Sequence, residues 1–391
     1  MESTAVDPVL NTAVERYYDT TLDLYEELWG EHVHHGFWDP GEVPGSGGAD
    51  RKKATDRLVT ELVDYARLPF GARILDVGCG IGGPALHLAG ALGAHIEGVT
   101  LSASQAARAT EKAAEAGLSG RTRFQQLDGL STGFPDGSFD AVWAVESLMH
   151  IPDRPAFFAE MFRLLRPGGT LAIATWSQRD GELSAEDEKV VKLVLKHQVM
   201  PSFSSLEDHV RMARTAGFSE VAFADWSSQV ANSWDPEFAM IERFENGKGL
   251  MRDLARERGV DVLGFFYAGP LMLKGFQTGA ITYGAVRATK PVAPSAELVA
   301  EVAELLRASA NIEAAVEAGT RLDGDLELDS VEVAGFAAAL RERYGDRVDL
   351  PGHIAGLDVE EIVGLSVADV AAHVAARLAP ALTAPYADPV P

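Results

Sequence analysis

Short apolar runs alternate with segments of helical periodicity through the middle of the chain. The apolar runs cover residues 73–78, 95–100, 139–145 and 170–176, and the helical segments cover residues 84–92, 104–116 and 154–165. This alternation predicts an α/β fold with a doubly wound, mostly parallel sheet. Ligands of such sheets bind beyond the carboxyl ends of the strands, so we expect the functional site in the loops after residues 78, 100, 128 and 146.

Other helix-like segments lie outside this alternation, before residue 67 and between about 180 and 278. We expect them to form a helical cap over the sheet edge. The 391 residues suggest more than one domain. Residues 291–296 contain two prolines and read as a linker. The sequence thus predicts an α/β domain over 1–290, a small all-α four-helix domain over 297–380 and a disordered tail over 381–391.

Charge excludes some classes of partner. The chain has 34 basic and 58 acidic residues, a formal charge of −24. Half of it lies beyond residue 290, where 18 acidic residues outnumber 6 arginines. Because such a surface repels phosphate groups, we expect neither a nucleic acid nor a membrane as partner. The single cysteine excludes an internal disulfide, and without a long apolar segment we predict a cytoplasmic protein.

A glycine-rich loop follows the first apolar run. Gly78, Gly80 and Gly82 allow a ligand to approach the backbone, and a helix starting near Pro84 offers free N–H groups. The loop also fits the dinucleotide pattern G-x-G-x-x-G, which alone is weak evidence. Asp76 argues against it, because a carboxylate beside the loop repels a pyrophosphate and attracts a cation. S-Adenosylmethionine, with an ammonium and a sulfonium group, fits that charge.

Further motifs occur in the order that class I S-adenosylmethionine-dependent methyltransferases show. They are Gly98–Gln105 after the second strand, Asp128 after the third, Phe139–Asp153 around the fourth and Leu165–Leu171 before the fifth. With the glycine loop, the chain resembles this family. The resemblance implies a Rossmann-like fold, S-adenosylmethionine as cofactor and no metal.

The resemblance also implies roles for single residues. Asp128 would accept from the adenine amino group, and Gln105 and Ser102 would reach the ribose. Thr100 departs from the family, because most members have an acid there that holds the ribose hydroxyls. The alternative is structural: glycines that tighten a turn, a turn aspartate and a packed cysteine. The predicted cofactor-binding residues are Tyr18, Asp76, Gly78, Cys79, Gly80, Gly82, Thr100, Leu101, Ser102, Gln105, Asp128, Gly129 and Glu146.

Upstream, Tyr17-Tyr18-Asp19 and His34–Trp38 resemble the cap of small-molecule methyltransferases that act on tocopherols, alkaloids, sterols and aminosugars. Related sugar O-methyltransferases carry a histidine pair where this chain has Met149 and His150, so the base for a hydroxyl is half present. Transfer to carbon or nitrogen needs less base catalysis and is expected ahead of oxygen. The predicted catalytic residues are His150, Glu146 and His34, each with a structural alternative.

The acidic C-terminal segment has a motif of its own. Asp329-Ser330-Val331 precedes a helix-like run and resembles the Asp-Ser-Leu signature of acyl and peptidyl carrier proteins. The resemblance implies a phosphopantetheine arm on Ser330, attached by a phosphopantetheinyl transferase, and docking of biosynthetic enzymes on the acidic surface. The alternative is that Ser330 only caps the helix.

These interpretations combine into one function. We expect a methyltransferase of polyketide or nonribosomal peptide metabolism fused to a carrier, with a free small molecule or a carrier-bound thioester as acceptor. The alternatives are a scaffold that binds S-adenosylmethionine without methyl transfer and docks the carrier, and a pericyclase or isomerase built on the same fold.

Overall fold

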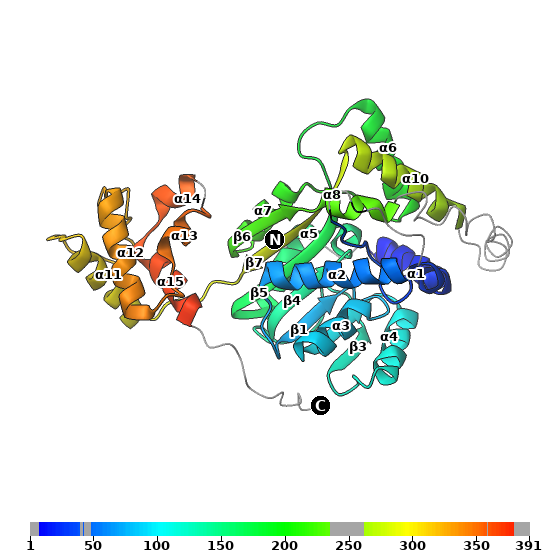
Figure 1. Ribbon diagram of the computed structural model, residues 1–391, viewed down its shortest axis with the longest axis horizontal. Helices are drawn as coiled ribbons and strands as arrows, with labels where there is room; N and C mark the ends of the chain where they lie inside the picture. Colours follow the sequence, from blue (N-terminus) through cyan, green and yellow to red (C-terminus); the bar gives the residue numbers. More distant parts are fainter. Residues whose placement is uncertain (1–7, 40–41, 43–47, 235–261, 358, 379–391) are drawn as a thin grey trace. The chain divides into compact units, whose positions relative to one another are not determined.

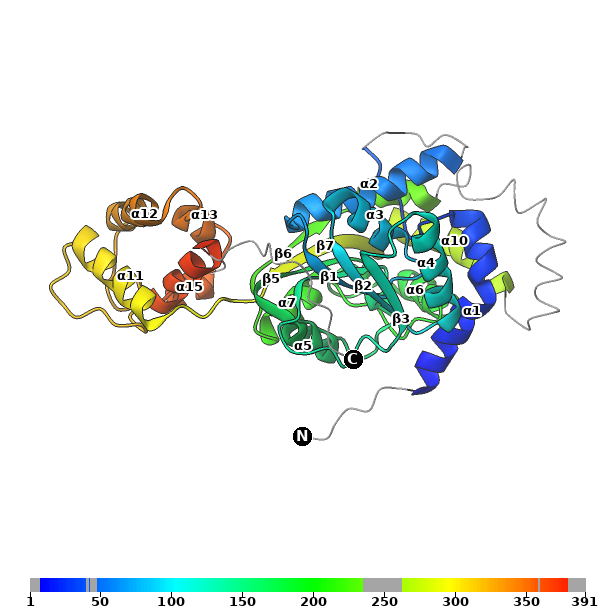
Figure 2. The ribbon, with the colours of Figure 1, turned by 90° about the horizontal axis from the view of Figure 1, so that it is seen from below.

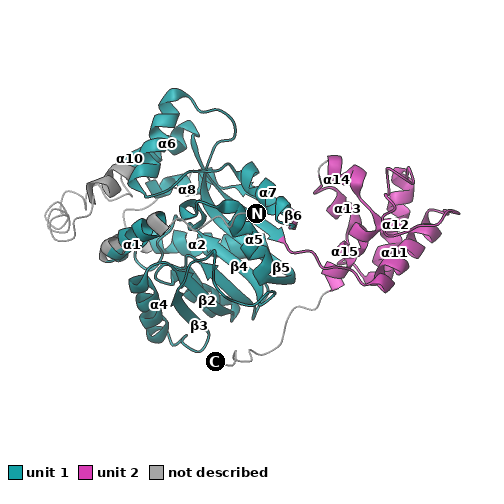
Figure 3. Ribbon diagram, turned by 180° about the vertical axis from the view of Figure 1, so that it is seen from behind, with its two compact units in different colours: residues 1–217, 221–288 teal, residues 218–220, 289–391 magenta. Residues whose placement is uncertain are grey.

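The structure is a computed structural model that describes residues 8–39, 42, 48–234, 262–357 and 359–378. The expected disordered tail, 381–391, lies outside these residues. The chain divides into two compact units, one of residues 1–217 and 221–288 and the other of residues 218–220 and 289–391 (Figure 3).

The described part of the first unit is built on a seven-stranded sheet of order β3-β2-β1-β4-β5-β7-β6. The strands are β1 (Arg73–Val77), β2 (His95–Thr100), β3 (Thr122–Gln126), β4 (Phe139–Val145), β5 (Leu165–Gln178), β6 (Ser219–Asp225) and β7 (Ile281–Thr289). The strands β3, β2, β1, β4 and β5 pair in parallel, and Asp76 stands in register with Gly98 and Trp143. The predicted doubly wound, mostly parallel sheet is thereby confirmed.

One strand differs from the expectation. Residues between about 180 and 278 were expected to be helical cap, yet Ser219–Asp225 adds β6 at an edge of the sheet. Its residues are mostly half-buried or exposed, with Val221 buried and Phe223 exposed. A strand at a sheet edge is covered less than a central one, so it lacks the continuous apolar run by which the central strands are found in sequence.

Helices cover both faces of the sheet. Figure 2 shows α2 (Gly48–Ala66) and α3 (Gly83–Leu92) on one face, and α5 (Arg154–Leu164) and α7 (Leu206–Thr215) on the other. Every residue of β4 is buried between these layers. Burying one large apolar side chain stabilises a fold by about 1.5–3 kcal/mol, so the layers hold the strand ends firmly in place. The segments expected to be helical cap contain α1 (Pro8–Trp29) and α2 before residue 67, and α6 (Ala185–His197), α7, α8 (Ser227–Val230), η2 (Ala231–Trp234) and α10 (Val262–Thr278) after residue 180.

Helix α1 (Pro8–Trp29) lies beside α4 (Ala103–Glu115) and is fastened to it by polar contacts (Figure 1). Asp19 accepts hydrogen bonds from the hydroxyls of Ser102 and Ser104. Two turns further along α1, the carboxylate of Glu26 accepts a hydrogen bond from the guanidinium of Arg108 at 2.8 Å. These contacts hold α1 over the carboxyl edge of the sheet, near the ends of β2 and β3.

Apart from Ser219, Glu220 and Thr289, which belong to strands of the sheet, the elements that the structure describes in the second unit are helices, five in place of the four expected. Its helices are α11 (Ala296–Ser309), α12 (Ser330–Tyr344), α13 (Leu350–Ile354), α14 (Val359–Gly364) and α15 (Val367–Leu378). Leu306, Phe336, Leu340 and Val370 are among the side chains that form its apolar core. Helix α12 starts with a capping box in which Asp329 accepts from the backbone of Val331 and Glu332.

Among the described helices, none combines the length and the apolar character that crossing a bilayer requires.

Candidate active site

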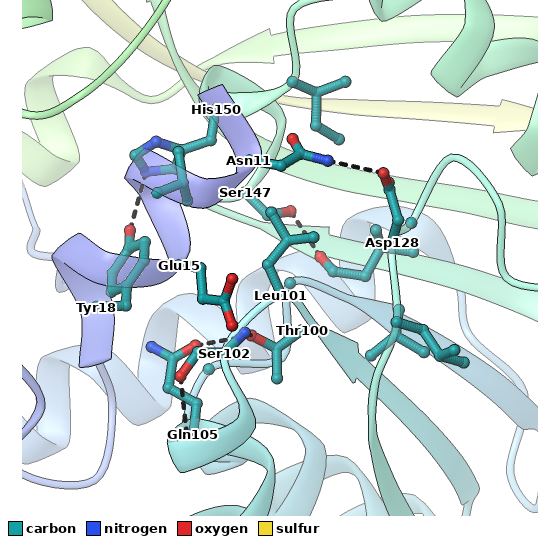
Figure 4. A pocket seen from close by; sticks show the side chains of 18 of the residues that line it. Asn11, Glu15, Tyr18, Thr100, Leu101, Ser102, Gln105, Asp128, Ser147 and His150 are labelled. Atoms are coloured by element: carbon teal, nitrogen blue, oxygen red, sulfur yellow. Dashed lines mark hydrogen bonds between the residues drawn. The ribbon is translucent and has the colours of Figure 1, made fainter. Parts of the chain in front are cut away.

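A cavity of about 880 Å³, counted out to its open mouth, lies where the carboxyl ends of the strands meet α1. Among the described residues that line it are three carboxylates, from Glu15, Asp128 and Glu146, and no lysine or arginine. Of the sequence-predicted residues, the cavity brings together Tyr18, Gly78, Gly80, Thr100, Leu101, Ser102, Gln105, Asp128, Gly129, Glu146 and His150 (Figure 4). Asp76, Cys79, Gly82 and His34 are not part of the lining.

The glycine loop leaves room for a ligand. Gly78 and Gly80 have φ angles of 80° and 52°, which L side chains rarely adopt. A Cβ on Gly78 would stand 2.3 Å from the Cβ of Ser147, whereas a Cβ on Gly80 would meet no atom within 4 Å. The first glycine therefore allows close packing of two strand ends, and the second borders open space.

Asp76 lies beneath this loop. It is 2% exposed, and its Oδ2 atom has no hydrogen-bond partner among the residues that the structure describes. Burial raises the pKa of Asp76 to about 7. Cys79 is buried as well, and burial likewise raises the pKa of its thiol. The charge that distinguishes this cavity from a phosphate site thus comes from Glu15, Asp128 and Glu146 rather than from Asp76.

Three side chains after β2 form a closed network. The hydroxyl of Thr100 donates to the side-chain oxygen of Gln105 at 2.7 Å and accepts from the backbone N–H of Ser102 at 3.3 Å. The hydroxyl of Ser102 caps α4, accepting from the backbone N–H of Gln105 at 3.0 Å, and donates to Asp19. The side chains are thus held in place, and their oxygens are already engaged.

After β3, Asp128 has a partner on each carboxylate oxygen. Its Oδ1 atom accepts from the backbone N–H of Leu130 at 2.9 Å, and its Oδ2 atom accepts from the amide of Asn11 at 2.8 Å. The second bond crosses from the sheet edge to α1. Asp128 therefore anchors the first turns of that helix as well as the loop in which it lies.

Glu146, just after β4, is buried with a φ of 49°. Its Oε1 atom accepts from the backbone N–H and the ring Nδ1 of His35, both at 2.8 Å, and from the hydroxyl of Tyr283 at 3.0 Å. The indole N–H groups of Trp176 and Trp234 point at the two ring nitrogens of His35, at Nδ1 (3.1 Å) and at Nε2 respectively, and so fix the position of the ring. Burial favours the neutral carboxyl, but the contacts with His35 outweigh it and lower the pKa of Glu146.

His34 turns away from the cavity into a chain of buried histidines. Its Nδ1 atom donates to the carbonyl of His35 at 2.8 Å, and its Nε2 atom lies 3.1 Å from Nδ1 of His32. Nε2 of His32 in turn pairs with Asp56 at 2.9 Å. Burial lowers the pKa of His34 to about 3, so it is neutral at physiological pH. In this arrangement His34 contacts protein groups on both ring nitrogens and has none left for a substrate.

His150 follows β4 in the short helix η1 (Leu148–His150) and lines the cavity. Its Nε2 atom lies 2.9 Å from the hydroxyl of Tyr18, and its Nδ1 atom lies 3.3 Å from the carbonyl of Val199. Nδ1 therefore carries the hydrogen and Nε2 accepts from Tyr18. Burial lowers the pKa of His150 to about 4. The ring is thus a neutral imidazole whose lone pair is held by a tyrosine that also lines the cavity.

These features fit S-adenosylmethionine. The cavity has a glycine floor that a Cβ would obstruct, three carboxylates for a ligand that bears cations, and no basic side chain for a pyrophosphate.

Comparisons with known proteins agree with the fold and with a methyltransferase domain. A family model described as a methyltransferase domain matches residues 75–173. A tocopherol O-methyltransferase of Arabidopsis thaliana is 34% identical over 294 residues, covering 72% of this chain and 83% of that protein. The 27-O-demethylrifamycin SV methyltransferase of Amycolatopsis mediterranei is 37% identical over 229 residues, with coverage of 58% and 80%. The (4+2)-cyclase SpnF superposes with a TM-score of 0.61 at 29% identity, covering 75% of this chain and 100% of that one.

The chain therefore belongs to the class I S-adenosylmethionine-dependent methyltransferases, and it is an enzyme of this class. The resemblance inferred from the sequence is confirmed for the methyltransferase region.

Sequence reasoning overlooked three residues of the site. Asn11 and Glu15 line the cavity from α1, and His35 holds Glu146. For α1 the sequence contained a signal. Asn11 and Glu15 lie seven and three residues before Tyr18, so on a helix all three share one face, and Tyr18 was among the predicted cofactor-binding residues. His35 had no such signal, since only the folded chain distinguishes it from His34.

Proposed function

We propose that this enzyme methylates a carbon or nitrogen atom of a small molecule of specialised metabolism, either free or carried as an acyl thioester. The metabolic setting is supported by relatives named for tocopherol and for 27-O-demethylrifamycin SV. The choice of atom rests on His150. With its pKa lowered to about 4, His150 is a weak base, which suits an acceptor that does not have to lose a proton before it attacks.

S-Adenosylmethionine supplies a methyl group on a sulfonium, which needs no further activation by the protein. The residues of this chain would then position and shield the reactants. Tyr18 and His150 wall the cavity beside Glu146, and Glu146 keeps its negative charge through the donors of His35 and Tyr283. A fixed carboxylate in a buried site favours a cation nearby. Holding donor and acceptor in line accounts for most of the acceleration in such a transfer.

The test is a turnover assay on the full chain. Formation of S-adenosylhomocysteine is measured with amines, electron-rich arenes, phenols, alcohols and acyl-carrier thioesters as acceptors. We expect turnover with an amine or a carbon nucleophile, and a kcat for His150→Gln within about tenfold of wild type. Turnover confined to hydroxyl acceptors, with a kcat loss of about 10²-fold or more in that variant, would contradict the choice of atom.

We further propose that the helical unit is an acyl or peptidyl carrier with phosphopantetheine on Ser330. Asp329 is the residue that caps α12, so the alternative role of Ser330 as the cap is wrong. Ser330 is exposed at the first position of the helix, and its neighbour Val331 is 75% exposed. A free hydroxyl beside an exposed apolar side chain and several carboxylates supports recognition by a modifying enzyme.

Mass spectrometry of the intact chain tests the carrier. After incubation with coenzyme A and a phosphopantetheinyl transferase, we expect the mass gain of one phosphopantetheine group on wild type and none on Ser330→Ala. Ser295→Ala is the matched control, since Ser295 is an exposed serine that caps α11. A wild type without mass gain, or a gain that survives Ser330→Ala, would overturn the proposal.

A second candidate is a pericyclic reaction on the same fold. The similarity to the cyclase SpnF, at 29% identity and across that whole chain, favours its inclusion. The two functions differ in product: a cyclase converts its substrate without forming S-adenosylhomocysteine. The turnover assay above therefore separates them when substrate loss and S-adenosylhomocysteine are followed together.

A further inference from the structure

We propose that Glu15, on helix α1, is the acceptor for the ribose hydroxyls of S-adenosylmethionine. The proposal rests on the dependence of this enzyme on that cofactor and adds a residue outside the sheet to its binding site. The side chains at the end of β2 leave open which group accepts the two hydroxyl protons of the sugar.

A ribose bound away from water needs hydrogen-bond acceptors. Each of its two neighbouring hydroxyls donates one proton, and a buried donor without a partner costs about 1–3 kcal/mol. A carboxylate is well suited to this pair, because it has two oxygens and can only accept when ionised. Ribose is the middle part of the cofactor, and β2 lies between β1 and β3 in the sheet, so its end is where the sugar is expected.

Each side-chain oxygen of Thr100, Ser102 and Gln105 already accepts a hydrogen bond within the protein. The amide oxygen of Gln105 already accepts from Thr100, whose own oxygen accepts from the backbone of Ser102. The Ser102 oxygen accepts from the backbone of Gln105, and its proton goes to Asp19. Among the residues that the structure describes, the amide NH₂ of Gln105 has no partner, and this group is a donor. It can serve a hydroxyl oxygen but cannot receive a hydroxyl proton.

The other two carboxylates of the cavity are less suited: both oxygens of Asp128 already accept a hydrogen bond, and Glu146 follows β4, which β1 separates from β2. Asp128 accepts from Leu130 on one oxygen and from Asn11 on the other. Glu146 is buried beyond β4, where one oxygen takes three donors from His35 and Tyr283.

Glu15 is the carboxylate that remains, and it faces the right place. In Figure 4 its carboxylate points from α1 toward the loop that contains Thr100, Leu101 and Ser102. The amide nitrogen of Gln126 donates both to Oε1 of Glu15 at 3.0 Å and to the carbonyl of Leu101 at 2.9 Å, which joins the two sides. Among the residues that the structure describes, Gln126 is the one hydrogen-bond partner of Glu15, and its Oε2 atom stays available.

This position has a consequence for the whole helix. Glu15 lies on the same face of α1 as Asn11 and Tyr18, which contact Asp128 and His150. A carboxylate in a loop of the sheet would bind the ribose whether or not α1 were docked on the sheet. With Glu15 in that role, binding of the ribose and the docking of α1 on the sheet support each other.

Calorimetry on the full chain tests the proposal with S-adenosylhomocysteine and its 2′-deoxy and 3′-deoxy analogues. This probe has the ribose but no sulfonium, so attraction between opposite charges does not obscure the result. We expect wild type to bind at least one deoxy analogue about tenfold to a hundredfold more weakly, the range for a hydrogen bond to a charged group. Glu15→Gln should weaken binding of the parent compound by a similar factor and lose the discrimination against the analogue.

Asp19→Asn is the matched control. It weakens the docking of the same helix on the same loop, but Asp19 does not line the cavity. We expect it to lower affinity for parent and analogues equally, so that the ratio stays at the wild-type value. A wild type that does not discriminate, or a Glu15→Gln variant that keeps the ratio, overturns the proposal without affecting the assigned cofactor. A wild type that binds no S-adenosylhomocysteine overturns both.

Discussion

The backbone N–H and the ring Nδ1 of His35 both reach Oε1 of Glu146, each at 2.8 Å. The N-terminal segment and the fourth strand, 111 residues apart, are thereby joined at the wall of the cavity. The contact also explains how Glu146 keeps a buried charge at a φ of 49°, a conformation that costs energy for a residue other than glycine.

The substitution Tyr283→Phe tests how much the hydrogen-bond donors around Glu146 stabilise its ionised carboxylate. The change removes the hydroxyl that donates to Glu146 at 3.0 Å and should lower the free energy of unfolding by about 1–3 kcal/mol at pH 7. Because the folded pKa of Glu146 is lowered, its contribution is complete above the unfolded value and is lost as pH falls through the folded one. The difference between variant and wild type should therefore shrink in acid.

Urea unfolding followed by tryptophan fluorescence measures this, since all six tryptophans precede residue 235 and report on the first unit. Equal stability of Tyr283→Phe and wild type at pH 7 would show that the hydroxyl does not stabilise the charge.

Alanine substitutions at Gly78 and Gly80 should differ in their main effect. The first should mainly lower stability, and the second should mainly weaken ligand binding. Gly78→Ala places a Cβ 2.3 Å from Ser147 at a φ of 80°, and should cost about 2–5 kcal/mol of stability. Gly80→Ala meets no atom within 4 Å, so it should cost only about 1–2 kcal/mol for its backbone conformation, while its methyl group obstructs the ligand. Thermal unfolding measures the effect on stability, and calorimetry with S-adenosylhomocysteine measures the effect on binding. A Gly80→Ala protein that binds this compound normally would contradict the assignment of Gly80 to the floor of the cavity.

Asp76→Asn should change how stability depends on pH. Asp76 has its pKa raised to about 7 by burial, so between about pH 4 and 7 the folded state binds more protons than the unfolded state. Wild type therefore loses stability as pH rises through this range, and the asparagine variant does not. We expect the variant to be the more stable of the two at pH 8, by up to about 4 kcal/mol. Melting curves from pH 4 to 8 measure it, and parallel curves for both proteins would be inconsistent with a buried aspartic acid.

Buried neutral histidines should make the first unit sensitive to acid. Burial lowers the pKa of His34 and His209 to about 3 and of His150 to about 4. Each takes up a proton on unfolding once pH falls below the ordinary value of about 6.5. Stability should decline from there down to about pH 4, by about 1.4 kcal/mol per pH unit for each histidine.

The substitution His209→Leu should reduce the slope of stability against pH in acid by the contribution of one histidine, about 1.4 kcal/mol per pH unit. Among the residues described, neither ring nitrogen of His209 has a hydrogen-bond partner, so the substitution should not destabilise the protein at pH 7. An unchanged acid slope in this variant would mean that His209 does not contribute to it.

The sequence predicted those features that repeat locally. Alternating apolar runs located β1, β2 and β4 to within about a residue, because buried parallel strands are apolar throughout. Edge strand β6 carries no such run and was missed, and β7, a mostly buried strand between β5 and β6, was not predicted either. In the site, the glycine loop and Asp128 could be predicted from their spacing. The partners of Glu146 could not, because neighbouring residues such as His34 and His35 have the same chemistry and only tertiary contacts decide which one faces the carboxylate.

The segment that packs on the glycine loop sets a limit on how this enzyme can be shortened. The carbonyl of Glu31 lies so near Gly83 that a Cβ there would be 2.1 Å away, and Asn11, Glu15 and Tyr18 form one side of the cavity. A fragment trimmed to the part that the family model matches, residues 75–173, would keep four of the central strands and lose this side altogether. The smallest piece able to capture its cofactor must therefore include α1, which begins at Pro8, far upstream of the segment that the family model matches.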